Sequence, residues 1–432
     1  MAMDSYSLHR VAISDVRMAE SSKVENGVLH IDRKELETLI LEDRYIREVE
    51  IKLARPGESK RIVPIKDIIE PRAKMNADLD TFPGCLSDPN YIAGTGDTVV
   101  LDGVCVITSG PLVNFQEGLV DMSGPGAEFC AFSQKCNVVL VMTPRENITK
   151  HEHEKAVRLA GIRAARYLGA LGRSAKERST TVYPVINPFA AGAEHPGLPK
   201  VLYVCQVIAQ GLLHDNYIYG LNAQGCLPLL ARPTEFMDGA VISGNCAAPC
   251  HKHSTFHYQN NPIVEDLLAE HGKTLNFIGV AISPVRTAFV EKERIGRQVF
   301  KLAQMLGVDG VIISEDGGGN PEADLMFLTR LLEKDGIKTV IVTDEYAGAD
   351  GASPGLADAT PEADAVVTNG NGNQRVLLPP MEETIGVLGT VERITGGHAG
   401  GLLPDGSVDM EIAGIMGSTN ELGFENLKTI AI

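Results

Sequence analysis

The bond between Asn245 and Cys246 is the point in this chain where residue types suggest a reaction of the backbone itself. A cysteine thiol can attack the carbonyl carbon of the preceding residue and move the acyl chain from nitrogen to sulfur. Elimination of the sulfur and hydrolysis of the resulting enamine would leave a pyruvoyl group on a new N-terminus. Its ketone is an electrophile for amines, so Cys246 would be the precursor of a cofactor. The dipeptide alone is a weak signal, and the residues around it decide its interpretation.

Four side chains that can carry protons or bind metals follow this bond. They are Cys250, His251, His253 and His257. His251 and His253 could move protons during cleavage or imine formation, because histidine titrates near neutral pH, and Ser243 is a third candidate to start the acyl shift. Cys250 could be a redox thiol beside the carbonyl or a buried core residue. The four could also bind zinc, but no second ligand pair is evident and cleavage would consume Cys246, so we predict no metal.

Polar side chains also follow buried apolar runs in the C-terminal part. We predict that four of them bind the substrate, namely Glu315, Asp344, Glu345 and Asn371, because functional groups gather at the carboxyl ends of parallel strands. The acidic loop 344–350 could equally be a solvated helix cap or a metal or acid-base site. The run Gly317-Gly318-Gly319 could cradle a phosphate, but its acidic neighbours favour a tight turn. The pair His214-Asp215 is predicted to be structural, since no serine nucleophile motif accompanies it.

The elements that position these residues are predicted from the apolar periodicity. Short β-branched runs predict strands, at 99–101, 104–108, 137–142, 200–209, 276–282, 310–314 and 339–343. Helical spacing predicts helices from near His151, up to Gly307, and after Pro321. Strands that alternate with helices indicate a parallel sheet. We therefore predict an α/β fold, with a strand-rich N-terminal part followed by a C-terminal Rossmann-like domain with a mostly parallel sheet.

Composition and length limit the class of protein. The 432 residues carry a net charge of −17, which argues against nucleic-acid binding because phosphates require a basic surface. No apolar run approaches the ~20 residues that span a bilayer, and residues 1–17 lack the apolar core of a signal peptide. The eight cysteines include no C-x-x-C pair, which favours reduced thiols and a cytoplasmic location. We predict three units: a strand-rich domain at 1–145, an α/β segment at 146–245 that ends at the candidate cleavage site, and the Rossmann-like domain at 246–432.

Longer stretches, spread from about residue 20 to 428, resemble one family. They closely resemble component B of the glycine, sarcosine and betaine reductases, in particular the proprotein that yields its α and β subunits. The stretches are 53–58, 115–118, 121–128, 210–215, 233–240, 243–246, 260–267, 342–348 and 417–424. Together they are more specific than any single motif.

The resemblance implies that the chain is cut before Cys246, which becomes an N-terminal pyruvoyl group, and that the products 1–245 and 246–432 stay associated. The substrate amine would form an imine with the ketone, which becomes a good leaving group once protonated. The implied partners are a selenocysteine-containing subunit of component B, selenoprotein A, which takes the carboxymethyl group, and component C, which releases acetyl phosphate. An oligomer is expected. The stretch 417–424 adds Ser418 and Thr419 to the predicted substrate-binding residues.

The substrate stays open at this point. Residues 247–253, 317–319 and 396–400 differ from the glycine-specific members of the family. Sarcosine is a secondary amine and can still form an iminium, whereas quaternary betaine cannot. Two alternatives also stand: an uncleaved homologue in which Cys246 serves as a thiol or metal ligand, and a non-catalytic scaffold for the selenoprotein subunit.

Overall fold

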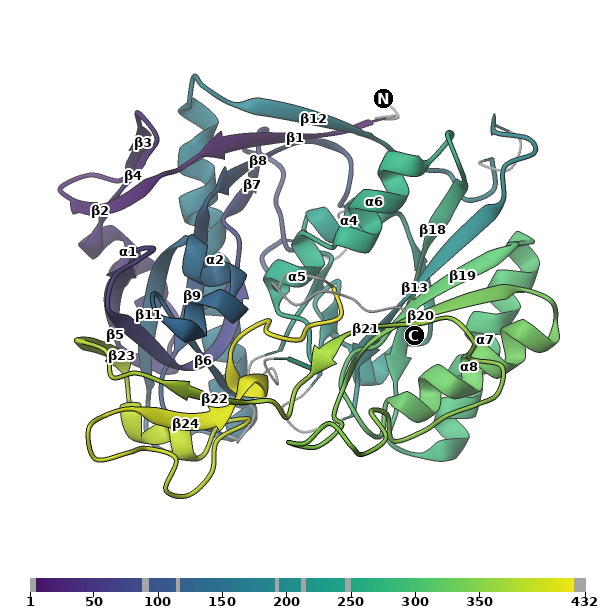
Figure 1. The fold of residues 1–432 in the computed structure, drawn as a ribbon. Coiled ribbons are helices and arrows are strands. Elements are labelled where there is room, and N and C mark those ends of the chain that lie inside the picture. The colour runs from purple at the N-terminus through teal and green to yellow at the C-terminus, as the bar shows by residue number, and fades with distance from the viewer. Residues whose placement is uncertain are drawn as a thin grey trace.

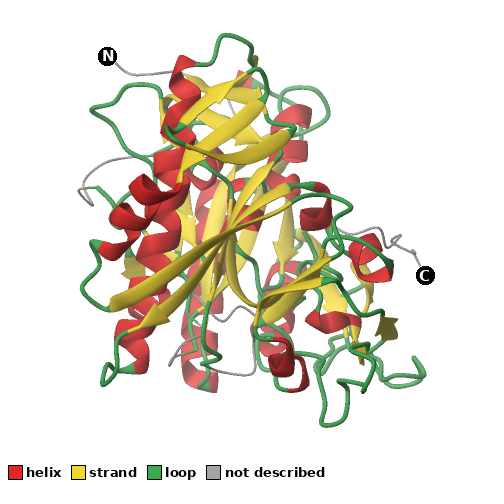
Figure 2. Cartoon of the chain, turned by 90° about the vertical axis from the view of Figure 1, so that its left-hand side faces the viewer, coloured by secondary structure: helices red, strands yellow, loops and turns green. Residues whose placement is uncertain are grey.

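The computed structural model describes residues 5–87, 93–113, 117–190, 194–210, 215–244 and 250–422. The Asn245–Cys246 bond and His214 lie outside the described residues. The described residues form a mixed α/β structure, as predicted for the fold class. In Figure 1 the N-terminal strands lie on the left and the strands and helices of the C-terminal half on the right. In the view from the side, strands occupy the centre of the molecule and helices flank them (Figure 2).

The N-terminal part is rich in strands. Its larger sheet is mixed and has the order β10-β6-β9-β11-β5. The strands are β5 (Ile46–Ala54), β6 (Lys60–Ile69), β9 (Val104–Ser109), β10 (Gly118–Asp121) and β11 (Cys136–Pro144). A second sheet has the order β12-β1-β8-β7 and joins β1 (Ser5–Ala12), β7 (Arg72–Lys74), β8 (Gly96–Asp102) and β12 (Ser179–Pro184). The strands predicted at 99–101, 104–108 and 137–142 are confirmed as β8, β9 and β11.

A small three-stranded sheet and a short helix extend this part. They are β2 (Asp15–Ala19), β3 (Lys23–Glu25), β4 (Val28–Asp32) and α1 (Arg33–Leu41). The Asp32 side chain accepts the backbone N–H groups of Lys34 and Glu35 and so caps the helix.

The helix predicted from near His151 is confirmed as α2 (Lys150–Leu171), which begins at a capping box between Thr149 and Glu152. One face of α2 is buried against the strands of both N-terminal sheets. Gly169 permits the close approach, because a Cβ there would lie 2.5 Å from the Arg72 backbone.

The sheet of the right-hand half is nearly all parallel. Its order is β16-β18-β13-β19-β20-β21, and its strands are β13 (Lys200–Ile208), β16 (Leu229–Ala231), β18 (Asn276–Val285), β19 (Gly310–Ser314), β20 (Lys338–Glu345) and β21 (Val366–Asn371). Only the edge strand β16 is antiparallel to its neighbour. The strands predicted at 200–209, 276–282, 310–314 and 339–343 are confirmed, and the Rossmann-like identity of the C-terminal domain stays a prediction.

The strand order changes direction at β13. The chain places β18 on one side of β13 and β19, β20 and β21 in succession on the other. In open α/β sheets such a reversal leaves a crevice beyond the carboxyl ends of the two strands that flank it, and ligands bind there. The loops after β13 and β19 therefore mark the expected position of a site.

Two long helices pack on this sheet. They are α7 (Phe289–Leu306) and α8 (Glu322–Lys334), which also contact each other. Gly307 ends α7 in the left-handed conformation, with φ of 61°, as predicted for a C-terminal cap.

Short elements fill the space between the two halves (Figure 1). They are β14 (Tyr217–Ile218), β15 (Leu221–Asn222), β17 (Val241–Ile242), α4 (Pro233–Met237), α5 (Thr255–Gln259) and α6 (Pro262–Glu270). Residues 244 and 250, which border the candidate cleavage site, therefore lie between β17 and α5.

The C-terminal segment returns to the N-terminal half. Its strands are β22 (Arg375–Leu378), β23 (Glu383–Gly386) and β24 (Val408–Glu411), and β23 pairs with β6 in parallel. One hydrophobic core contains both Ile62 and Val139 of the N-terminal sheet and Ile385 and Met410 of this segment. Segments from both sides of residue 245 thus share two sheets and a core.

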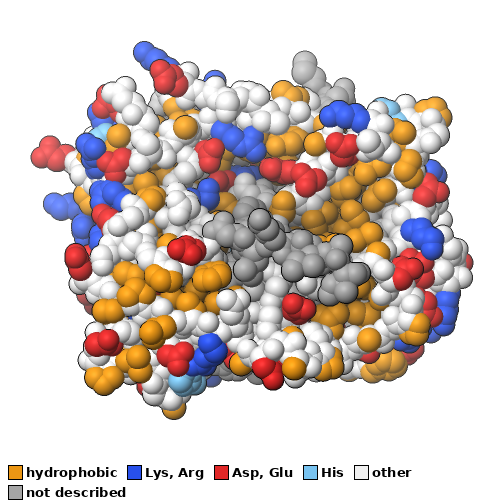
Figure 3. Space-filling model, viewed as in Figure 1, with side chains coloured by type: hydrophobic (Ala, Val, Ile, Leu, Met, Phe, Trp, Pro, Cys, Tyr) orange, Lys and Arg blue, Asp and Glu red, His pale blue; other side chains and the backbone are white. Residues whose placement is uncertain are grey.

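Two surface properties complete the description. None of the helices in the described part of the chain is long and apolar enough to cross a membrane. The face in Figure 3 carries acidic and basic side chains interspersed with one another.

Candidate active site

Buried polar side chains gather at the carboxyl edge of the parallel sheet, near the loop after β19. They come from four segments that are distant in sequence: Cys250, His251 and His253, then Glu315, then Asp344, and finally Thr419 and Glu421. All except the half-buried His251 are at most 3% exposed. We call these seven residues the polar cluster. The position agrees with the strand reversal at β13, since Glu315 directly follows β19 and Asp344 lies at the end of β20.

Asp344 is central to the polar cluster. One of its carboxylate oxygens lies 2.9 Å from Nδ1 of His251. The His251 ring stacks on Tyr346, with ring centroids 4.0 Å apart and an angle of 16° between the planes. Gly318 packs on the same imidazole, because a Cβ there would lie 2.4 Å from its carbon Cε1. The glycine-rich run therefore supports His251, consistent with the turn favoured above.

The Cys250 thiol contacts Tyr346, one of the two stacked rings. Its sulfur is 2.6 Å from the Tyr346 hydroxyl, and either group can donate the hydrogen bond. Burial, assisted by the negative charge of Asp344, raises the pKa of Cys250 well above its usual value. The thiol is therefore protonated at neutral pH and is a poor nucleophile.

Two carboxyl groups of the polar cluster are also held in the protonated form. Burial, followed by repulsion from Asp344, raises the pKa of Glu315 and of Glu421 well above the ordinary value for glutamate. The Thr343 hydroxyl donates a hydrogen bond to Glu315. Glu421 Oε1 lies 2.5 Å from Nε2 of His253. These groups therefore hold their protons to higher pH than an ordinary glutamate does.

Asp316 has a structural role next to the polar cluster. Its carboxylate accepts hydrogen bonds from the backbone N–H groups of Ile208 and His253 and from the side chains of Asn216 and Tyr258. This network joins the carboxyl ends of β13 and β19 to the segment that leads into α5.

The structure does not bring every predicted residue into the polar cluster. Glu345 lies on the other side of β20 from Asp344, as strand alternation requires, and lines a separate pocket with Met326 and Thr368. Asn371 braces the loop after β20, since its amide accepts the backbone N–H of Ala347 and donates to the carbonyl of Gly348.

The remaining predicted residues lie as follows. The buried Ser418 hydroxyl donates to the carbonyl of Ile412, which leaves it a structural contact. Thr419 is buried beside Cys250. Asn245 and Cys246 cannot be placed, because they lie outside the described residues. Asp215, the described member of the pair predicted to be structural, accepts a hydrogen bond from Asn222.

Sequence reasoning missed Tyr346 and Glu421. Both lie within stretches quoted above for the family resemblance, 342–348 and 417–424, and that was the only sequence signal for them. Their contacts with Cys250, His251 and His253 depend on the tertiary fold.

Several buried polar atoms at this site are available to a ligand. Within the described residues, Oε1 of Glu315, Nδ1 of His253 and Nδ2 of Asn420 are buried without a hydrogen-bond partner. Leaving such atoms unsatisfied costs free energy, so they fit a polar molecule that brings donors and acceptors of its own. A small amino acid has this character. The same atoms also fit the ketone of a pyruvoyl group on the new N-terminus that cleavage before Cys246 would create.

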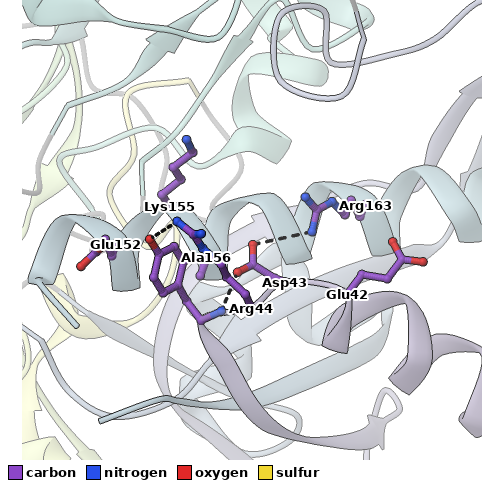
Figure 4. Close-up of a pocket in the computed structure, with 8 residues that line it drawn as sticks. Glu42, Asp43, Arg44, Glu152, Lys155, Ala156 and Arg163 are labelled. Carbon is purple, nitrogen blue, oxygen red and sulfur yellow. Dashed lines mark hydrogen bonds and ion pairs between the residues drawn. The ribbon is translucent and has the colours of Figure 1, made fainter. Parts of the chain in front are cut away.

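A surface pocket of about 450 Å³ opens over His251 and Tyr346. Its other walls come from the C-terminal segment and include Glu392, Arg393, the pair Gly396-Gly397 and Glu411. A second surface pocket, about 420 Å³ in volume, lies between α2 and the turn that follows α1 and contains no predicted site residue (Figure 4). Its charged groups pair with each other, as Arg163 does with Asp43 at 3.7 Å.

The four residues considered for zinc are not gathered as one set. His253 contacts Glu421, and Nδ1 of His257 accepts the backbone N–H of Ser254. At this site, among the described residues, the potential ligand atoms within 4.8 Å of one another belong instead to Cys250, His251 and Asp344.

Comparison with known proteins identifies relatives that are named as reductase components. The chain is 46% identical to the glycine reductase complex component B subunits alpha and beta of Acetoanaerobium sticklandii, over 96% of this chain and 97% of the relative. It is 44% identical to the sarcosine reductase complex component B subunit alpha of Peptoclostridium acidaminophilum, over 97% and 98% of the two chains. The betaine reductase complex component B subunit alpha of the same organism is 35% identical over 92% and 93%.

These relatives are components of reductases, so the chain is a component of an oxidoreductase. The model of the glycine/sarcosine/betaine reductase component B subunits matches residues 4–430, and the chain belongs to that family. The resemblance stated from the sequence is thereby confirmed. No solved structure matches the chain.

Proposed function

We propose that this protein is the substrate-activating subunit of a selenoprotein-dependent reductase for glycine or an N-methylated glycine. In this proposal the chain cleaves itself between Asn245 and Cys246, and Cys246 becomes a pyruvoyl group. The observation that carries the proposal is the polar cluster, whose buried acids, thiol and histidines begin four residues after Cys246 in the chain.

Cleavage is supported by two observations. The name of the glycine reductase relative assigns two subunits, alpha and beta, to one chain that covers nearly the whole of ours. Strands from both sides of residue 245 pair in the same sheets, so the two products would remain one folded body.

The reaction that forms the ketone balances without an oxidant. The Cys246 thiol adds to the Asn245 carbonyl carbon, a C–S bond replaces the C–N bond, and the thiol proton ends on nitrogen. Elimination and hydrolysis then consume two waters and release ammonia and hydrogen sulfide. The products are a carboxyl group on residue 245 and a ketone at position 246.

The chain's own residues would manage protons and charge at this ketone. The pyruvoyl ketone supplies an electrophile that condenses with the substrate amine and weakens its C–N bond. Glu315 and Glu421, whose pKa values are raised, can donate protons at neutral pH. The Asp344 carboxylate next to His251 stabilises positive charge that develops on nitrogen.

The substrate class follows from the free polar atoms and the relatives. Nδ2 of Asn420 is a donor suited to a carboxylate, and Oε1 of Glu315 suits an amine. Identity to the glycine and sarcosine enzymes, 46% and 44%, exceeds the 35% to the betaine enzyme. Glycine and sarcosine can both condense with a ketone, whereas the quaternary nitrogen of betaine cannot.

The remaining parts of the proposal concern partners and location. The protein works in the cytoplasm with a selenocysteine-containing subunit of component B, passes the carboxymethyl group to selenoprotein A, and depends on component C for acetyl phosphate. The pocket over His251 and Tyr346 is the route by which a small amine, or a selenol, would reach the polar cluster.

A denaturing mass spectrum of protein made in its native host tests the proposal. Two fragments, 1–245 and 246–432, are expected, and reduction with borohydride in the presence of glycine or sarcosine should add to the second fragment the mass of that amine less one oxygen atom. An intact chain would point to an uncleaved homologue that uses Cys246 as a thiol or ligand. Cleaved protein that traps neither amine would point to a scaffold for the selenoprotein.

A further inference from the structure

The carbonyl group of Gly244, the residue before Asn245, receives two side-chain donors. The Ser243 hydroxyl lies 3.0 Å from this oxygen, and Nζ of Lys252 lies 3.4 Å from it. Both side chains are buried, Ser243 completely and Lys252 to within 3%. A lysine this buried is uncommon, because an ammonium group loses its hydration when it leaves water.

A second set of contacts fixes Ser243 from the other half of the molecule. Its backbone N–H donates to the Thr255 hydroxyl at 3.0 Å. Thr255 in turn donates its hydroxyl and its backbone N–H to the two oxygens of Asp67, at 2.6 and 2.9 Å. Asp67 lies on β6, which has paired strands on both sides in the larger N-terminal sheet, so the arrangement rests on a rigid element.

Gly244 itself is confined by its surroundings. A Cβ at this position would lie 2.2 Å from the backbone oxygen of Asp215, so only glycine fits without displacing that backbone. The direction in which the chain leaves Gly244 is therefore set by contacts on three sides, from Asp215, Lys252 and Ser243.

The charge near this carbonyl has a chemical use. Covalent geometry keeps the next carbonyl carbon within about 5 Å of the Gly244 oxygen. The acyl shift places negative charge on the attacking sulfur and then on that carbonyl oxygen. An ammonium group held at Gly244 by burial and hydrogen bonding stabilises the negative charge on the sulfur and then on the carbonyl oxygen.

We propose that Lys252, Ser243, Thr255 and Asp67 form a processing site that drives cleavage of the chain after Asn245. Lys252 is a positioning residue that holds the Gly244 peptide unit and supplies positive charge beside the acyl shift. Thr255, anchored on Asp67, orients Ser243. The processing site includes neither of the two histidines predicted to start the acyl shift. This inference rests on the proposed function, since it assumes that cleavage occurs.

The test measures cleavage rather than reductase activity. The full chain is expressed, and the fraction of 1–245 and 246–432 is followed over time by denaturing gel and intact mass. Lys252→Met keeps the length of the side chain but removes the charge, and should slow cleavage at least about tenfold, whereas Lys252→Arg should retain part of the rate.

Thr255 supplies a matched pair of variants. Thr255→Val has nearly the same shape but lacks the hydroxyl that donates to Asp67 and accepts from Ser243, so cleavage should slow. Thr255→Ser keeps both hydrogen bonds and should restore the rate. If Thr255 had a purely structural role, the cleavage rates of these two variants would not differ according to whether the side chain carries a hydroxyl group.

Lys292 provides the control for loss of a buried lysine. It is also 3% exposed and pairs with Asp324 in the right-hand half, away from the processing site. Lys292→Met should lower the melting temperature and leave the cleavage rate unchanged. If Lys252→Met does not fold by the same melting measurement, the Thr255 pair decides the question.

The outcomes separate the two proposals. If the wild-type chain made in its native host stays intact, the proposed function fails and this inference fails with it. If the wild type is cleaved but folded Lys252→Met and Thr255→Val are cleaved at its rate, the processing site is overturned while the proposed function stands. Slowing in both variants, with recovery in Thr255→Ser, supports the processing site.

Discussion

Asp344 and His251 are 93 residues apart in the chain, yet a carboxylate oxygen of the first lies 2.9 Å from Nδ1 of the second. The contact joins the end of β20 to the segment that follows the candidate cleavage site. It also places the charge of Asp344 where it raises the pKa of Glu315, Glu421 and Cys250. Four predictions follow from this site and its surroundings.

Asp344→Asn should move the pH dependence of substrate trapping. The substitution removes a negative charge, so the pKa values of Glu315 and Glu421 fall, and protonated carboxyl groups are lost at lower pH. The basic limb of borohydride trapping against pH should shift to lower pH. Asp350→Asn, in the same loop but exposed, is the control and should not shift it. An unmoved limb in Asp344→Asn would show that Asp344 does not act on the titrating acid.

Cys250 should resist alkylation in the folded protein. Its thiol is fully buried and burial raises its pKa, so both access and thiolate fraction are low. Iodoacetamide at neutral pH should modify the half-buried Cys226 well before Cys250, as read by peptide mass spectrometry of the same sample. Both should react after unfolding. Equal rates in the native protein would contradict the enclosed position of the thiol.

Asp67 should make the folded protein less stable as pH rises. Burial raises the pKa of Asp67 from 3.8 to about 7, against smaller opposing effects of the hydrogen bonds from Thr255 and Ile68 and of the Lys252 charge. The folded state therefore holds the proton more tightly than the unfolded chain. The contribution of this carboxyl group to the free energy of unfolding is fully present below about pH 4. It is lost as pH rises through about 7, and the loss is about 4 kcal/mol at most.

Asp67→Asn removes this dependence. Urea unfolding at about pH 4.5 and about pH 8 should show that the stability of the wild type relative to the variant falls with rising pH. Asp405→Asn, at an exposed carboxylate whose pKa is lowered by Ser407, should not show that fall. A wild-type-to-variant difference independent of pH would mean that Asp67 is ionised throughout.

The two cleavage products should remain bound under native conditions. β13 precedes residue 245 and is hydrogen-bonded on both sides by strands that follow it, β18 and β19. In the N-terminal half, β23, which follows residue 245, pairs with β6, which precedes it. Cleaved protein should elute as one species from a sizing column in high salt and separate only in denaturant. Separation in salt alone would contradict this strand exchange.

The sequence by itself determined much of the local structure. The alternation of apolar runs and the cap at Gly307 predicted the strands and helices of the right-hand half, because backbone hydrogen bonding and side-chain periodicity act over short distances. The position of the polar loops after β19 and β20 followed in the same way. The motifs around Cys246 also pointed to the family that the comparisons confirm.

Tertiary structure alone decided which of these side chains meet. Asp344 and Glu345 are adjacent and equally acidic, yet the pleat of β20 sends them to opposite faces, and only Asp344 joins the polar cluster. Lys252 and Asp67 carry no sequence motif, and they are brought together around Ser243 and Thr255 by the packing of α5 against β6. Contacts between residues far apart in sequence depend on how whole elements pack, and local sequence carries little information about that.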